Sequence, residues 1–198
     1  MNLIFSEVND SEALQEVFAF RYKIISETDI FEGYVRETEF PDNKESDKFD
    51  PYSIHFVAKD KDGNICATIR LIHHSPHGYP TEKMDFDNSM FQRDKLGEIS
   101  RIFIHPDYRD FKTTKKIIYN FNKLLYPKLM EHGIEYSYGA LQSNLIRLLR
   151  MFNAHYEEIC EMKMLGSMGL RYPCILYTKR FGEDNPELKK AWEEQNEH

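Results

Sequence analysis

The 198-residue chain carries 26 Lys+Arg against 33 Asp+Glu, a net charge of −7, with 41% hydrophobic and 30% charged residues. This balance fits one folded domain and argues against extensive disorder, and the acidic sign disfavours binding to nucleic acid. Three widely separated cysteines, Cys66, Cys160 and Cys174, exclude a fully paired disulfide framework and fit a reducing compartment. No apolar run reaches the roughly 18 residues of a membrane-spanning helix, and the start lacks signal-peptide features. We therefore expect a cytoplasmic protein without a transmembrane segment.

Hydrophobic spacing predicts an alternation of strands and helices. Residues 11–27 have apolar side chains at the i, i+3, i+4 spacing of a helix, with Ser11 as its cap. Two strand-like runs flank Asp62-Gly63, which is typical of an antiparallel hairpin. In chain order we expect a strand at 3–5, a helix at 11–27, a hairpin at 53–72, a strand at 96–105, a helix at 112–131, a strand at 134–141, a helix at 144–153, and closing strands at 155–164 and 172–180. This order predicts an α/β (α+β) domain with a mostly antiparallel sheet flanked by helices on both faces.

Residues 1–181 form one predicted domain, because no linker, repeat or low-complexity block divides them. Residues 182–198 form an acidic C-terminal tail, expected to be a loosely docked helix or a frayed end. Residues 32–50 contain seven acids and three bases without apolar periodicity, which predicts a long, partly mobile loop. Such loops are uncommon inside compact domains, and some are lids over functional sites.

Six charged residues occupy positions where charge is unfavourable unless it is paired. They are Arg21 on the apolar side of the first helix, Asp47 and Asp50 in the acidic loop, Arg70 in a strand, and Glu98 and Arg101 in another strand. Glu98 and Arg101 share a face of that strand only if a bulge separates them. The six could form one buried network that only locks the loop onto the sheet. Alternatively, they could line an amino-acid-sized pocket, because arginine forks hold carboxylates, and carboxylates hold or deprotonate ammonium groups.

A basic segment begins the helix at 112–131. From Arg109 to Lys128 there are six bases and one acid, a local charge of +5 in an acidic protein. Free backbone N–H groups at the helix start, beside Arg109 and Lys112, would form an anion site. A solvated helix face is the alternative, but the reversal of sign favours an acidic partner or a phosphate.

Weaker signals come from histidine, cysteine and methionine. His73, His74 and His77 lie in a polar turn region without spaced Cys or carboxylate ligands, so we expect exposed loop histidines and no metal site. Cys66 is expected to be a small core residue rather than a nucleophile. The segment around Leu148 and Phe152 is expected to form core together with Met151, Met162, Met164 and Met168, although methionine-rich walls would also suit a flexible acyl chain.

Four motifs in order give the chain a resemblance to acyl-homoserine-lactone synthases and related N-acyl amino acid synthases of the GNAT acyltransferase superfamily. They are FRYKII with Arg21, ESDKFD with Asp47 and Asp50, TIRLI with Arg70, and GEISRIFI with Glu98 and Arg101. The motifs cover residues 14–105, and the order of elements agrees to about residue 180. The resemblance implies a GNAT-like mixed sheet, splayed into a V that admits an acyl thioester, and transfer of a fatty acyl group from acyl carrier protein to an amine.

Two departures refine what the resemblance implies. A typical GNAT places glycines of an R/Q-x-x-G-x-G/A loop beside the pyrophosphate of coenzyme A, whereas residues 109–114 place Lys112 and Thr114 there. Acyl carrier protein, which is acidic and presents a single phosphodiester, is therefore the expected donor partner, at Arg109, Lys112, Thr113, Lys115 and Lys116. Synthases that use S-adenosylmethionine typically carry a Trp after the first helix, where this chain has Phe31 and Tyr34. An amino acid is therefore the expected acceptor.

The resemblance implies direct transfer with no bound cofactor. Glu98, directly or through a water, would be the base, with Arg101 beside it, and a backbone N–H near Ile102, Phe103 or Ile104 would bind the developing oxyanion. The acceptor carboxylate would be held by Arg21, Arg70 or Arg101, while Asp47 and Asp50 order the loop or contact the ammonium group. An acyl-homoserine-lactone synthase using S-adenosylmethionine is the first alternative function. A non-catalytic module that binds acyl carrier protein or lipid is the second.

Overall fold

The computed structural model describes residues 2–27 and 40–196, which form one eight-stranded sheet in the order β1-β2-β3-β4-β5-β8-β6, with β7 also paired to β8. The strands are β1 (Ile4–Glu7), β2 (Ser53–Lys59), β3 (Ile65–His73), β4 (Leu96–Ile104), β5 (Tyr136–Leu141), β6 (Glu157–Glu158), β7 (Lys163–Met164) and β8 (Leu170–Tyr177). In the described chain β4 and β5 pair in parallel, and every other strand pair is antiparallel. The predicted α/β class with a mostly antiparallel sheet is confirmed.

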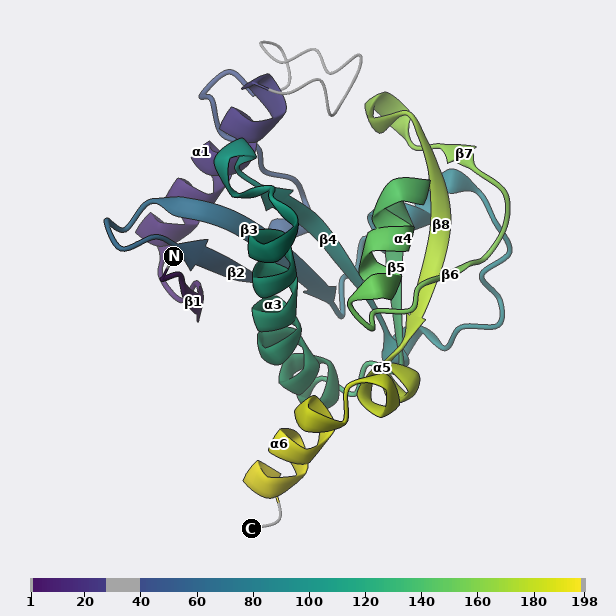
Figure 1. The fold of residues 1–198 in the computed structure, drawn as a ribbon. Helices are drawn as coiled ribbons and strands as arrows, with labels where there is room; N and C mark the ends of the chain where they lie inside the picture. The colour runs from purple at the N-terminus through teal and green to yellow at the C-terminus, as the bar shows by residue number, and fades with distance from the viewer. Residues whose placement is uncertain (1, 28–39, 197–198) are drawn as a thin grey trace.

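Helices cover both faces of the sheet (Figure 1). The helices are α1 (Ser11–Glu27), α3 (Phe111–Glu131), α4 (Ser143–Met151), α5 (Thr178–Asp184) and α6 (Pro186–Asn196). The apolar stripe of α3, including Ile117, Phe121 and Leu125, packs with Phe56 and Leu71 of the sheet in the main core. On the opposite face α1 buries a stripe of its own against Val57 and Phe103.

The hairpin between β2 and β3 forms where the Asp62-Gly63 signal predicts it. Gly63 has φ +88°, a left-handed conformation that other residues rarely adopt. The Asp60 carboxylate accepts hydrogen bonds from the N–H groups of Asp62 and Asn64, both at 2.9 Å. Because residues 60–64 fix the turn by their own hydrogen bonds and backbone conformation, the local sequence is enough to predict it.

The sheet splits open between β4 and β5. Their pairing covers only Leu96–Glu98 against Tyr136–Tyr138, although β4 continues to Ile104 and β5 to Leu141. Beyond Glu98 the two strands diverge, and no strand of the described residues pairs there with the edge of β4 that faces β5 (Figure 1). This is the predicted V-shaped opening.

Three local predictions are wrong. Asp10, not Ser11, caps α1, since its Oδ1 accepts from the Ala13 N–H at 2.7 Å. Residues 155–164 form only two-residue strands, because the ladder of β6 with β8 ends next to Pro173, which has no N–H to continue it. Three of the methionines expected in the core, Met151, Met162 and Met164, are exposed.

The acidic tail from residue 182 is helical and packed rather than frayed over its described part. Leu188 of α6 is buried in the main core, and Trp192 packs against that core. None of the described helices combines the length and the apolar character needed to cross a membrane.

Candidate functional site

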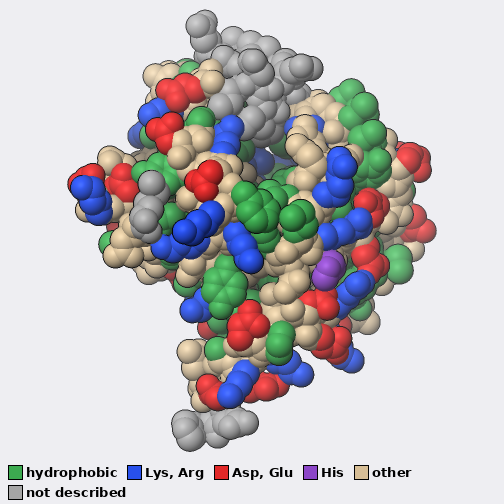
Figure 2. All heavy atoms as spheres, viewed as in Figure 1, with side chains coloured by type: hydrophobic (Ala, Val, Ile, Leu, Met, Phe, Trp, Pro, Cys, Tyr) green, Lys and Arg blue, Asp and Glu red, His purple; other side chains and the backbone are tan. Residues whose placement is uncertain are grey.

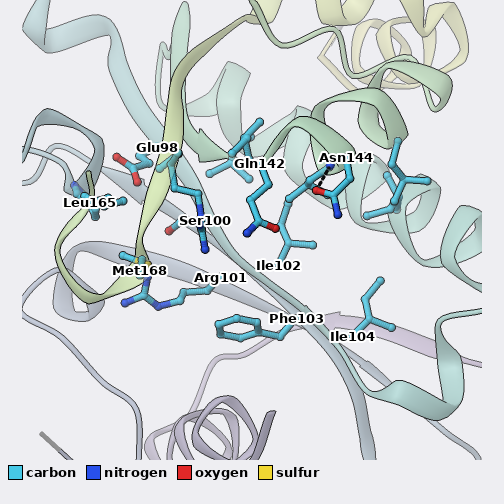
Figure 3. Close-up of a pocket in the computed structure, with 18 of the residues that line it drawn as sticks. Glu98, Ser100, Arg101, Ile102, Phe103, Ile104, Gln142, Asn144, Leu165 and Met168 are labelled. Carbon is cyan, nitrogen blue, oxygen red and sulfur yellow. Dashed lines mark hydrogen bonds between the residues drawn. The ribbon is translucent and has the colours of Figure 1, made fainter. Parts of the chain in front are cut away.

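A cleft of about 420 Å³ lies in the opening between β4 and β5. One wall is β4 from Glu98 to Ile104, and the other is the end of β5 with the start of α4, including Gln142 and Asn144 (Figure 3). The first turns of α3 contribute Thr114 and Ile118. Most other lining residues are apolar: Pro80, Ala140, Leu141, Leu145, Leu148, Leu165 and Met168. The predicted residues Ile102, Phe103 and Ile104 therefore do line a cavity.

A bulge in β4 brings Glu98 and Arg101 to the same cleft. Thr68 pairs with Phe103 and Arg70 with Ser100, so one residue of β3 faces two residues of β4. Arg101, one of those two, has φ +55°. The extra residue reverses the alternation of side chains, and Glu98 and Arg101, three positions apart, both line the cleft.

Three arginines and three carboxylates form one buried ion network, but its third carboxylate is Glu45 rather than Glu98. Glu45 contacts both Arg21 and Arg101, with Oε1 of Glu45 2.7 Å from Nη2 of Arg101. The remaining pairs are Arg21 to Asp50 at 2.9 Å, Arg70 to Asp47 and to Asp50 at 2.7 Å, and Arg101 to Asp47 at 3.0 Å. Arg70 also donates through Nε to the Ser100 hydroxyl. The formal charges of the six side chains cancel, which allows burial.

The charge balance sets how these groups titrate. Burial alone would raise the pKa of Glu45, Asp47 and Asp50, but the arginines hold each pKa below its usual value. His55 lies with Nε2 3.6 Å from Oδ1 of Asp50. Burial, together with Arg21 and Arg70, lowers the pKa of His55 to about 4, so this ring is neutral at pH 7.

Glu98 stands apart from the network. It is 1% exposed, and its Oε2 accepts a hydrogen bond from the Thr81 N–H at 2.9 Å, with no ion pair among the described residues. Burial raises the pKa of Glu98 to about 7, against the lowering effects of the Thr81 hydrogen bond and of Arg70 and Arg101. A carboxylate that titrates near neutrality at the inner end of a cleft is suited to accept a proton.

A second pocket of about 340 Å³ adjoins the cleft. The two share Pro80, Arg101, Leu165 and Met168. The second pocket adds charged side chains to these: Glu45, Asp47, Lys48 and Lys83. Of the predicted substrate-binding residues, Asp47 lines this pocket, whereas Arg21, Asp50 and Arg70 line neither of the two pockets. Phe31 and Tyr34, which replace the expected Trp, lie outside the described residues.

The basic start of α3 borders the cleft but is not the free helix end that the sequence predicts. Oδ1 of Asp110 caps the helix by accepting a hydrogen bond from the Thr113 N–H at 3.0 Å. One of the backbone N–H groups at the helix start is therefore already paired with a carboxylate. Arg109 lines the cleft and donates through Nε to the carbonyl of Ile104 at 2.8 Å. Lys112, Lys115 and Lys116 are exposed. Lys and Arg side chains spread over this face on α3 and α4, with hydrophobic side chains between them (Figure 2).

Two residues of the site, Glu45 and Arg171, carry little signal in the sequence. Glu45 is one of seven acids in its loop, and no spacing distinguishes it. Arg171 begins β8, is 8% exposed and lines the cleft. Among the described residues Arg171 has no carboxylate partner, and its one side-chain hydrogen bond goes from Nη1 to the carbonyl of Leu170 at 2.8 Å. The sequence signal for Arg171 is its position in GLRYP, one residue before the strand predicted at 172–180.

The predicted loop histidines divide into two environments. His74 and His77 are exposed, as predicted, whereas His73 is half-buried at the end of β3. His73 and His74 lie beside His132, the residue that follows α3. Cys66 is buried in the main core, as predicted.

A family model described as an acetyltransferase (GNAT) domain matches residues 30–118, and no curated protein matches the sequence significantly. Among solved structures, TofI in a ternary complex with an inhibitor and MTA aligns with a TM-score of 0.65 at 14% identity, covering 95% of this chain and 100% of that chain. BjaI, a CoA-dependent acyl-homoserine lactone synthase, aligns with a TM-score of 0.65 at 13% identity, covering 95% of this chain and 90% of that chain. FeeM, an N-acyl amino acid synthase from uncultured soil microbes, aligns with a TM-score of 0.60 at 13% identity, covering 92% of this chain and 96% of that chain.

These similarities extend over nearly the whole chain. They confirm the GNAT-like fold that the resemblance implies. The chain therefore has the GNAT acyltransferase fold, in the form found in acyl-homoserine-lactone synthases and in an N-acyl amino acid synthase.

Proposed function

We propose that the chain is an N-acyltransferase that moves a fatty acyl group from acyl carrier protein to the amine of an amino acid. One observation carries this proposal: a mostly apolar cleft opens between β4 and β5 and holds a buried carboxylate, Glu98, whose pKa is raised to about 7. The apolar walls suit an acyl chain, and the carboxylate suits the deprotonation of an amine.

The acyl thioester would enter past the start of α3. Arg109, Thr114 and Ile118 bring this end of the helix to the cleft, and Leu145 and Leu148 line the cleft from α4. In the part of the chain that the structure describes, no strand pairs with the cleft edge of β4 beyond Glu98. A backbone N–H among Ile102, Phe103 and Ile104 could therefore bind an oxyanion.

Arg171 is the best candidate to hold the acceptor carboxylate. Arg21, Arg70 and Arg101 each already contact two of the buried carboxylates, whereas Arg171 contacts none among the described residues. A nearly buried guanidinium without a counter-charge favours an anionic ligand, and a carboxylate would accept two parallel hydrogen bonds from it.

In the proposed reaction Glu98, directly or through a water, takes a proton from the acceptor ammonium group. The freed amine nitrogen attacks the thioester carbonyl carbon, a C–N bond forms, and the C–S bond breaks. Before the C–S bond breaks, the carbonyl oxygen carries the negative charge as an oxyanion held by the backbone N–H of β4. As the oxyanion collapses to the amide carbonyl, the attacking nitrogen loses its second proton, and this proton goes to the thiolate that leaves on the phosphopantetheine arm.

Acyl carrier protein is favoured over coenzyme A as the donor for two reasons. Exposed Lys112, Lys115 and Lys116 form a basic surface beside the cleft, which complements an acidic partner. The side chains at Lys112 and Thr114 occupy positions where a typical GNAT has glycine, so the backbone cannot approach a pyrophosphate as closely.

The experiment is incubation of the full chain with acyl carrier protein thioester and mixed amino acids, followed by mass spectrometry. N-acyl amino acid is the expected product, and acyl-CoA in place of the carrier is expected to react more slowly. Product from acyl-CoA alone would refute the carrier as donor. Binding of acylated carrier without turnover of any amine would refute the proposed acyltransferase activity and would support a non-catalytic binding module instead.

Acyl-homoserine-lactone synthesis is the second candidate, favoured by the structural similarity to TofI and BjaI. The same incubation with S-adenosylmethionine added distinguishes it. Lactone that forms only with S-adenosylmethionine, without N-acyl amino acid, would replace the first proposal with this one.

A further inference from the structure

Three histidines meet at the closed end of the sheet, away from the cleft. The His73 and His132 rings stack with centroids 3.9 Å apart, and the His74 ring lies 5.4 Å from His73 and 6.0 Å from His132. Each ring offers a nitrogen, and these three atoms all lie within 4.8 Å of one another. We propose that this histidine trio binds one divalent transition-metal ion of the zinc type.

The chemistry of the three ligands points to that class of metal. Neutral imidazole is a preferred ligand of Zn²⁺, Cu²⁺ and Ni²⁺, whereas Mg²⁺ and Ca²⁺ prefer oxygen ligands. Three protein nitrogens with water as the fourth ligand would complete a tetrahedral zinc site. Zn–N bonds of about 2.0–2.1 Å place bound nitrogens about 3.4 Å apart. The half-buried His132 ring must therefore turn out of its stack on His73, and the exposed His74 ring must rotate, before the three in-plane lone pairs converge on one ion.

A second observation indicates that the trio lacks a partner. Nδ1 of His73 is buried and has no hydrogen-bond partner, and no side-chain hydrogen bond links His74 or His132 to another described residue. A buried polar atom without a partner is costly, and a metal ion bound at that nitrogen would remove the cost.

The backbone supports the site, and the nearby charge suits a cation. His73 ends β3, paired with Gly97 of β4, and the His132 N–H is hydrogen-bonded to the carbonyl of Lys128 at the end of α3. Glu7 and Glu131 both lie beside Lys128, at 3.3 Å and 3.0 Å, and leave one net negative charge close to His132. A bound ion would therefore join the end of β3 to the end of α3.

The site is separate from the proposed reaction. The start of α3 lines the cleft, whereas His132 follows the other end of the same 21-residue helix, about 30 Å away at 1.5 Å per residue. Metal binding is therefore measured directly and without reference to acyl transfer.

The test uses the tag-free full chain with Cys160→Ser, which removes the partly exposed free thiol as a competing ligand. Calorimetric titration with zinc chloride is expected to show one Zn²⁺ per chain, and magnesium chloride is expected to show none. Co²⁺ is expected to give the visible absorption of a tetrahedral site. His132→Gln and His74→Gln are each expected to weaken zinc binding at least tenfold, whereas His77→Gln, on the same loop, leaves it unchanged.

Circular dichroism of the metal-free variants checks that each one is folded, and the exposed His74 serves as the main test if His132→Gln does not fold. The absence of stoichiometric zinc binding would overturn the proposal. Zinc binding that falls equally in the His77→Gln control, or that survives both trio substitutions, would overturn it as well.

Discussion

Arg101 holds Glu45 across 56 positions of sequence, with Nε 3.0 Å and Nη2 2.7 Å from the same Oε1 atom. Glu45 also pairs with the fully buried Arg21, so this single carboxylate joins α1, the loop before β2 and the bulge of β4. The pairing fixes the side chain of Arg101 between the cleft and the second pocket.

Glu45→Gln is expected to destabilise the fold strongly. The substitution leaves the ion network with one uncompensated buried positive charge, which costs roughly 3–5 kcal/mol of unfolding free energy. Urea unfolding measures the loss. Glu16→Gln is the matched control, because Glu16 forms a partly exposed pair with Lys59 at 3.0 Å and such pairs contribute about 1 kcal/mol or less. Equal losses in the two variants would contradict the role of Glu45.

Glu98→Gln is expected to lower the acylation rate by roughly 10²–10⁴-fold, the usual contribution of a positioned general base. The wild-type rate is expected to rise with pH through about 7, the raised pKa of Glu98, and this limb is expected to disappear in the variant. Stopped-flow acylation at saturating acceptor measures both effects, and unfolding curves show whether the variant is folded. A near-normal rate with an unchanged pH profile would exclude Glu98 as the base.

Arg171→Ala is expected to raise the KM for an amino acid acceptor by roughly 10–100-fold, because a charge-assisted hydrogen-bond pair contributes about 1.5–3 kcal/mol. Arg171→Lys keeps the charge but loses the planar fork, so it should recover only part of this affinity. The matched control is an amine without a carboxylate, whose KM is expected to stay the same. If both acceptors lose affinity equally, Arg171 does not hold the carboxylate.

Reversal of Lys112, Lys115 and Lys116 to Glu is expected to slow association with acyl carrier protein, most strongly at low salt. Biosensor kinetics at two ionic strengths measure the effect. Reversal of the exposed lysines Lys61, Lys189 and Lys190 makes the same change in net charge away from the cleft and serves as the control. Association that slows equally in both triple variants would assign the effect to net charge and not to a docking surface.

Acid is expected to destabilise the protein below about pH 4. The folded state holds the pKa of Glu45, Asp47 and Asp50 below that of the unfolded chain, so the unfolded state binds more protons there and stability falls as pH falls. Glu98 acts in the opposite direction: its raised pKa costs stability as pH rises from about 4.5 to about 7.

Urea midpoints from pH 3 to 8 measure both effects. In Glu98→Gln the loss between pH 4.5 and 7 is expected to disappear, while the loss below pH 4 remains. A variant that keeps the loss between pH 4.5 and 7 would contradict the raised pKa of Glu98.

The elements of this fold are largely predictable because their signals are local. The apolar stripe of α3, the hairpin around Gly63 and the strand of β4 each follow from spacing or turn chemistry within about 20 residues. Residues 155–164 resist prediction because their pairing depends on Pro173 in β8, a residue outside the segment.

The candidate site is predictable only in part. The charges at Arg21, Arg70 and Arg101 stand out against apolar neighbours. Together with Asp47 and Asp50, they make five of the six network members identifiable from the sequence. That Glu45, and not Glu98, is the third carboxylate of the network is not predictable, because the acids of the loop have no periodicity that would distinguish one from another.

The order of strands and helices, the charged residues in apolar segments and the basic start of α3 can all be read from the sequence, because each is a property of neighbouring residues. Long-range packing determines which carboxylate neutralises Arg101 and brings His132 against His73 across 59 positions of sequence. It also places Arg171 at the cleft with no counter-charge among the described residues. The physical reason is that ion pairing, burial and metal ligation depend on distances of a few ångströms between chain segments, and those distances are set by packing of the whole sheet and its helices.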